Sequence, residues 1–335
     1  MPRSNAAHWV GDAALLTAGA VGAWVAYSRL RIPRAAPLPP ALPGRREILR
    51  TEAAGAVSLY GTAEPDGTPL LLIHSVNAAA SAYGVRPLYQ RYRGTRPVYA
   101  LDLPGFGFSE RSRRLYTPRL MVDAIATVTR TIRGRHNGVP LDAMAVSLSC
   151  EYLARAAVEC PDDYRSLGLI SPTGFDARLS GRGPRAGQRG NDLMRNAFDF
   201  PVLGRAAFDA LASRRSLRHF LGKAFGSEQV DAGLIEYDYL TAHQPGAEHA
   251  VACFLSGDLF PTDATTVYEA LRLPVWMVHG TRGDFVDYRD AGRFERRPNW
   301  TAVTLPTGAM PQFERLGEMT ERYNAFLSSI DRGET

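Results

Sequence analysis

Short apolar runs alternate with segments of helical periodicity along much of this chain. Residues 70–74 (Leu-Leu-Leu-Ile-His) form a short apolar run, which is typical of a strand buried on both faces of a parallel sheet. The remaining pattern predicts strands at 47–53, 56–62, 97–101, 141–146 and 166–170, and helices at 81–92, 116–133 and 149–159. Strand and helix alternating at this spacing predict βαβ crossovers. We therefore expect an α/β fold with a mostly parallel sheet covered by helices on both faces.

The alternation stops between residues 178 and 270. This stretch shows helical segments at 193–198, 202–213 and 229–241 but no buried strand run. Strands resume at 273–279 and 300–305, followed by a helix at 313–330. A helical block inserted between two strands of one sheet predicts a cap or lid. The expected division is therefore a core at 45–177 and 271–335, a helical cap at 178–270, and an N-terminal segment with its linker at 1–44.

The N-terminal segment contains an uncharged stretch from Ala13 to Tyr27, followed by Arg29, Arg31 and Arg34. It is shorter than the roughly 20 apolar residues that a spanning helix needs. Two interpretations remain open: an anchor that contacts a membrane, or a helix that packs on, or trails from, a cytoplasmic domain. If the segment inserts, the arginines favour a cytoplasmic body. The proline-rich stretch 36–44 predicts a stiff spacer after it.

Composition narrows the function classes. The chain has 335 residues, of which 45% are hydrophobic and 22% charged, so collagen-like, disordered and multi-span membrane classes are excluded. The net charge of +5 is spread along the chain, which argues against a nucleic-acid partner. The three cysteines are widely spaced, and no Cys/His cluster, P-loop or dinucleotide fingerprint is found. We expect no metal and no cofactor.

In open α/β sheets the ligand site lies at the carboxyl ends of the strands. The turns that follow three of the predicted strands read His-Ser-Val-Asn at 74–77, Asp-Leu-Pro-Gly-Phe-Gly-Phe-Ser at 102–109 and Ala-Val-Ser-Leu-Ser at 145–149. With 169–175, 278–284 and 308–314, these motifs resemble the α/β-hydrolase superfamily, in the family's order across residues 47–330. The resemblance implies the α/β-hydrolase fold and a serine-type hydrolase that acts on an ester, thioester or other carbonyl substrate.

The resemblance assigns Ser147 the position of the nucleophile. The family usually has glycines on either side of this turn, and Ala145 and Ser149 are the smallest replacements. The backbone N–H of Leu148, at the start of the following helix, is the expected first donor to an oxyanion, and that of Val76 the second.

The acid that the family places after the strand at 273–279 corresponds to Asp284, with Asp287 as a nearby competitor. Its role in such a site is to hold an imidazole in the right tautomer and to stabilise its charge.

The position of the family's general base departs from the pattern. Family members carry Gly-His-x-Pro before the last helix, whereas this chain reads Gly-Ala-Met-Pro at 308–311, so Ala309 occupies the histidine position. Neither Met310 nor Gln312 can accept a proton from a serine at neutral pH. The remaining candidates for a replacement base are His74, His243, His249 and His279.

Two functions therefore stay open. The first is a serine hydrolase with an incomplete or rearranged triad that acts on a small apolar carbonyl substrate. The second is a non-catalytic protein that uses the inherited pocket to bind a small apolar ligand or a protein partner.

Overall fold

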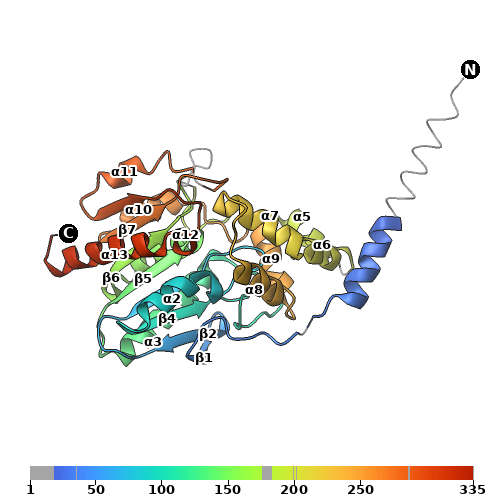
Figure 1. The fold of residues 1–335 in the computed structure, drawn as a ribbon, viewed down its shortest axis with the longest axis horizontal. Helices are drawn as coiled ribbons and strands as arrows, with labels where there is room; N and C mark the ends of the chain where they lie inside the picture. Colours follow the sequence, from blue (N-terminus) through green and yellow to red (C-terminus); the bar gives the residue numbers. More distant parts are fainter. Residues whose placement is uncertain are drawn as a thin grey trace, which may run out of the picture.

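The computed structural model describes residues 19–34, 36–175, 183–198, 200, 202–285 and 287–334. Its centre is an eight-stranded sheet in the order β1-β2-β4-β3-β5-β6-β7-β8 (Figure 1). The strands are β1 (Arg45–Thr51), β2 (Gly55–Thr62), β3 (Leu70–Ile73), β4 (Val98–Asp102), β5 (Leu141–Val146), β6 (Tyr164–Ile170), β7 (Val275–His279) and β8 (Trp300–Thr304). The pairs β1–β2 and β2–β4 are antiparallel, and all other pairs are parallel.

Helices cover both faces of this sheet, as predicted. Alternate residues of β3 point to opposite faces: Leu71 and Ile73 join one buried cluster, and Leu70 and Leu72 join the other. The first cluster contains side chains of α3 (Pro118–Arg135) and α4 (Ser149–Glu159), and the second those of α2 (Arg86–Tyr92) and α13 (Leu316–Asp331). Burial on both faces explains why β3 is apolar at every position.

Most predicted elements lie within a few residues of the observed ones, and β5 and α4 have the predicted bounds. The predicted helix at 81–92 is a short 3-10 helix, η1 (Ala82–Val85), followed by α2. The last predicted helix is divided into α12 (Pro311–Glu314) and α13. The short helix α11 (Gly292–Glu295) was not predicted.

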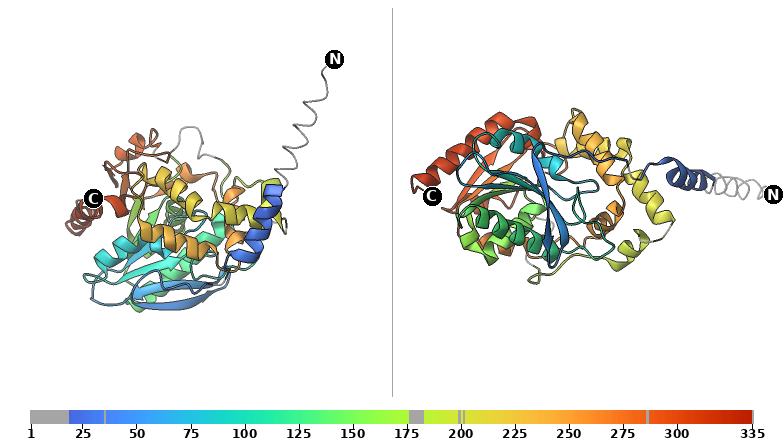
Figure 2. Two further views of the ribbon diagram at one scale, coloured as in Figure 1. Left: turned by 45° about the vertical axis from the view of Figure 1, so that its right-hand side comes forward. Right: turned by 90° about the horizontal axis from the view of Figure 1, so that it is seen from below.

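Six helices lie between β6 and β7 in the described part of the chain: α5 (Asp192–Phe198), α6 (Leu203–Leu211), α7 (Arg214–Phe225), α8 (Ala232–Ala242), α9 (Ala247–Leu255) and α10 (Ala264–Ala270). Figures 1 and 2 show α5 to α9 together at one end of the sheet, whereas α10 packs against α4. The sequence analysis missed α7, α9 and α10. For α7 the signals were present, because Ser213 caps its start through a bond from the Ser216 N–H and Gly226 ends it in a left-handed conformation.

Residues 19–31 are helical and dock on α6. The Trp24 indole N–H donates to the Ala206 carbonyl (2.8 Å), and the Ser28 hydroxyl donates to the fully buried Asp209 carboxylate (2.6 Å). Arg34 pairs with the same carboxylate at 2.8 Å. Within the described residues no helix has the length and apolarity that crossing a membrane requires. Residues 13–18 of the predicted apolar stretch lie outside the described residues.

Candidate active site

Ser147 occupies a strained turn between β5 and α4. Its φ is +56°, a left-handed conformation that costs a side-chain-bearing residue roughly 1 kcal/mol or more. The Ser147 N–H donates to the Ile170 carbonyl at the end of β6 (2.8 Å), so the turn begins where the β5–β6 pairing ends. This strained strand-to-helix turn places the Ser147 side chain at the carboxyl edge of the sheet.

The serine that replaces the second glycine of this turn has its own partner. Ser149 is fully buried, and its hydroxyl donates to the His74 carbonyl in the loop that follows β3 (2.6 Å). This bond joins the Ser147 turn to the loop that contains Val76, because β3 and β5 are neighbouring parallel strands. Leu148 lies at the start of α4, where the first N–H groups of a helix have no partner within the helix. The structure thus brings Ser147, Leu148 and the Val76 loop to one edge.

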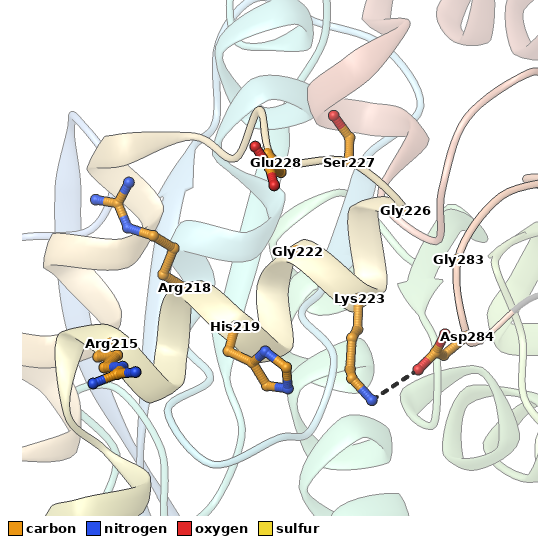
Figure 3. Close-up of a pocket in the computed structure, with 10 residues that line it drawn as sticks. All are labelled: Arg215, Arg218, His219, Gly222, Lys223, Gly226, Ser227, Glu228, Gly283 and Asp284. Atoms are coloured by element: carbon orange, nitrogen blue, oxygen red, sulfur yellow. Dashed lines mark ion pairs between the residues drawn. The ribbon is translucent and has the colours of Figure 1, made fainter.

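Asp284 lies on the loop after β7 and faces α7. Its carboxylate is 3.0 Å from the Lys223 ammonium, and its N–H donates to the Lys223 carbonyl (3.2 Å). Figure 3 shows this pair, and 57% of the Asp284 side chain is exposed. The competitor Asp287 forms an ion pair with Arg289. The carboxylate at the predicted acid position therefore has a counter-ion on α7.

Ala309 lies against the same end of α7. Its N–H donates to the Ala224 carbonyl (2.7 Å), and a Cβ added to Gly308 would lie 2.4 Å from that carbonyl oxygen. The structure therefore brings Asp284 and Ala309 together against Lys223 and Ala224. Gln312, the nearest polar side chain, is fully buried and donates its amide to the Gly84 carbonyl (3.1 Å).

Two candidate histidines are engaged in the framework of the sheet. The Nε2 atom of His74 accepts a hydrogen bond from the Leu103 N–H (3.0 Å), so Nδ1 carries the ring proton and donates it to the Ser75 carbonyl (2.6 Å). Burial lowers the pKa of His74, which keeps this ring neutral. The ring of His279 stacks on Tyr288 at 4.0 Å. Both histidines connect loops at the edge of the sheet.

The other two candidates lie in the helical block. His243 is buried, its Nδ1 bonds to the Tyr239 carbonyl (2.7 Å), and burial lowers its pKa. His249 lines a separate cavity of about 300 Å³ with Arg113 and Arg195. In the described part of the chain, none of the four histidines hydrogen-bonds to Ser147.

A buried acid that was not predicted from the sequence lies one helical turn after Ser147. Glu151 is 5% exposed, accepts a hydrogen bond from the Thr173 hydroxyl through Oε1, and has no partner at Oε2 among the described residues. Burial raises the pKa of Glu151 to about 7. The signal in the sequence was a carboxylate within the apolar face of α4, next to Cys150 and Leu153.

Comparison with known proteins shows which solved structures share this fold. No protein-family model and no curated protein matches the chain. A thermophilic esterase from Thermogutta terrifontis is 16% identical, with 86% of this chain and 99% of the esterase covered at a TM-score of 0.64. A bacterial membrane phospholipase A is 20% identical (97% and 98% covered, TM-score 0.61), and a carboxylesterase from Bacillus subtilis is 16% identical (86% and 93%, TM-score 0.61).

Proposed function

We propose that this chain, whose fold is that of the α/β hydrolases, is a serine-type hydrolase that cleaves small apolar esters through Ser147. The observation that carries the proposal is the left-handed backbone of Ser147 at the start of α4, a strain that proteins retain at functional positions. The bond from Ser149 to the loop after β3 holds this turn beside Val76.

In the proposed reaction the Ser147 Oγ attacks the carbonyl carbon of the ester. The backbone N–H groups of Leu148 and Val76 stabilise the negative charge that develops on the carbonyl oxygen. The serine proton passes to water because Ala309 offers no acceptor. The bond from the carbonyl carbon to the leaving oxygen then breaks, and the departing alkoxide takes a proton from water to leave as the alcohol. Water then releases the acid from the acyl enzyme. Oxyanion stabilisation and binding alone supply roughly 10³–10⁴-fold over the reaction in water, so we expect slow turnover of esters with good leaving groups. We further propose that residues 178–270 act as the predicted cap over this site.

A second candidate function has a specific observation in its favour. Asp284 pairs with Lys223 instead of a histidine, and Ala309, at the position of the base, offers no proton acceptor and donates its N–H to the Ala224 carbonyl. This arrangement favours the non-catalytic alternative, in which the pocket binds a small apolar ligand or a partner.

Labelling with a fluorophosphonate probe distinguishes the two functions. For the hydrolase we expect slow labelling of the native chain that Ser147→Ala abolishes. A matched control is Ser171→Ala, because Ser171 is also left-handed (φ +46°) but is buried and follows β6, and its removal should leave labelling unchanged. Labelling of the native chain no faster than that of Ser147→Ala would favour the binding protein.

For the N-terminal segment, Ala13 to Tyr27, we propose membrane contact. Three apolar side chains of the helix at 19–31 are exposed: Val21 (48%), Tyr27 (53%) and Leu30 (81%). The bonds from residues 24 and 28 to residues 206 and 209 show that this helix and α6 run in the same direction, which brings Val21 to the level of the exposed Leu203. The membrane phospholipase A, which aligns with 97% of this chain, supports the proposal.

Vesicle co-sedimentation tests this membrane contact. The double variant Val21→Asp/Leu30→Asp places a charge at each of two exposed apolar positions and leaves the contacts of Trp24 and Ser28 with α6 intact. We expect the native chain to sediment with vesicles and the variant to remain in the supernatant. Equal sedimentation of the two proteins would contradict the proposal.

A further inference from the structure

A groove separates α7 from the loop that follows β7. It has a volume of about 700 Å³ and is open to solvent. Charged and small residues line it (Figure 3), among them Arg215, Arg218, His219, Lys223, Glu228 and Asp284. Ser147 is not among the lining residues, so the groove is distinct from the proposed nucleophile.

Three basic side chains of the groove share one face of α7. Arg215, His219 and Lys223 follow one another at intervals of four residues, and Arg218 is adjacent to this row. Lys223 has Asp284 as its counter-ion. In the described part of the chain, no carboxylate lies within ion-pair distance of Arg215 or Arg218.

The preceding arginine of the same helix shows the contrast. Arg214 pairs with Glu236 at 2.8 Å, and its guanidinium lies 3.6 Å from the centre of the Tyr239 ring. Arg214 thus joins α7 to α8. Its hydrogen bonds are the main reason that the pKa of Glu236 is lowered, and the charge of Arg218 also lowers that pKa. Arg215 and Arg218 have no comparable role in joining helices.

The floor of the groove is formed by main chain in close contact. A Cβ added to Gly226 would lie 2.6 Å from the Gly283 nitrogen, and one added to Gly283 would lie 2.4 Å from the Lys223 carbonyl oxygen. Both glycines have positive φ. The two segments therefore meet without side chains between them. The hydrogen-bond donors that line the groove belong to the arginine and histidine side chains.

We propose that this groove binds a phosphate ester. A guanidinium presents a planar fork of N–H donors that matches phosphate oxygens, and Arg215 lies one helical turn before His219 on the same side of α7 (Figure 3). With Asp284 neutralised by Lys223, the one opposing charge in the lining is that of Glu228. The volume leaves room for an organic group on the phosphate. The phosphate belongs either to a soluble ester or to a lipid headgroup.

Calorimetric titration of the full chain at low salt, with inorganic phosphate and with glycerol 3-phosphate, tests the soluble source. Co-sedimentation with phosphatidic acid vesicles, compared with phosphatidylcholine vesicles, tests the lipid source. The variant is Arg215→Gln/Arg218→Gln. The matched control is Arg45→Gln/Arg50→Gln, which removes the same charge from exposed positions of the edge strand β1.

We expect at least one phosphate source to bind the native chain and the control, and binding to the groove variant to weaken at least tenfold. Binding of glycerol 3-phosphate would identify a soluble ester, whereas binding only to phosphatidic acid vesicles would identify a lipid headgroup. Three results would overturn the proposal: no binding of either source to the native chain, equal loss in the variant and the control, or undiminished binding to the variant.

Discussion

Glu151 makes the stability of this protein depend on pH in a direction that can be calculated. Burial within α4 raises the pKa of its carboxyl from an ordinary 4.5 to about 7. Between these two pH values the folded state holds a proton that the unfolded state has released. Each pKa unit corresponds to about 1.36 kcal/mol, so ionising Glu151 in the folded state costs about 3 kcal/mol. Stability should therefore fall as pH rises from about 4.5 to 7, and this contribution should level off above pH 8.

The substitution Glu151→Gln removes this cost because the amide stays neutral at every pH. The amide oxygen retains an acceptor for the Thr173 hydroxyl. We expect the variant and the native chain to have similar unfolding free energies near pH 4.5, and the variant to be more stable by about 3 kcal/mol at pH 8.5. Urea unfolding followed by tryptophan fluorescence at several pH values measures this difference.

A second carboxylate of α4 provides the control. Glu159 lies at the exposed end of the helix, paired with Arg119 at 2.7 Å, and Glu159→Gln should change stability by less than about 1 kcal/mol. A difference between Glu151→Gln and the native chain that stays constant from pH 4.5 to 8.5 would refute the reasoning. Glu151 would then be ionised, or already compensated, in the folded state.

Three further outcomes are expected. Asp209→Ala removes the buried carboxylate to which Ser28 and Arg34 both donate and should cost about 3 kcal/mol, with faster tryptic cleavage of the N-terminal helix; unchanged cleavage would show that other contacts hold the helix. Ser147→Gly relieves the left-handed strain and should raise the unfolding free energy by about 1 kcal/mol while abolishing fluorophosphonate labelling. Ser149→Ala removes the bond to the loop after β3 and should cost about 1 kcal/mol in thermal unfolding, and a loss within experimental error would show that this bond contributes no net stability.

The sheet could be predicted because its elements have local signals. A strand buried on both faces is apolar at successive positions, as in β3, and α4 begins directly after the Ser147 turn. The helix α7 was missed although its buried residues Leu217, Leu221 and Phe225 follow a spacing of four. Its exposed positions are dense in arginine, which obscured the apolar stripe. The apolar spacing of a helix was therefore present in the sequence of α7, although no helix was predicted there.

The turn at Ser147 between a strand and a helix could be predicted because it depends on neighbouring residues in the chain. The surroundings of the other site residues could not, because their partners come from distant elements. Lys223 reaches Asp284 from another part of the chain, and the Leu103 N–H fixes the tautomer of His74. Sequence motifs name the residue types at a position but not the hydrogen bonds those residues make elsewhere.

The two departures from the usual triad, at Asp284 and at Ala309, both involve contacts with helix α7. The end of α7 contacts Ala309 through the Ala224 carbonyl and holds Asp284 through Lys223. A histidine introduced at 309 alone would meet an acid that is already neutralised, so Ala309→His should increase fluorophosphonate labelling only slightly. Ala309→His/Lys223→Ala releases the carboxylate and should label at least tenfold faster than either single variant, by the orienting role of the acid. If the single variant Ala309→His labels as fast as the double variant, the ion pair does not restrain Asp284, and the missing histidine alone accounts for the incomplete site.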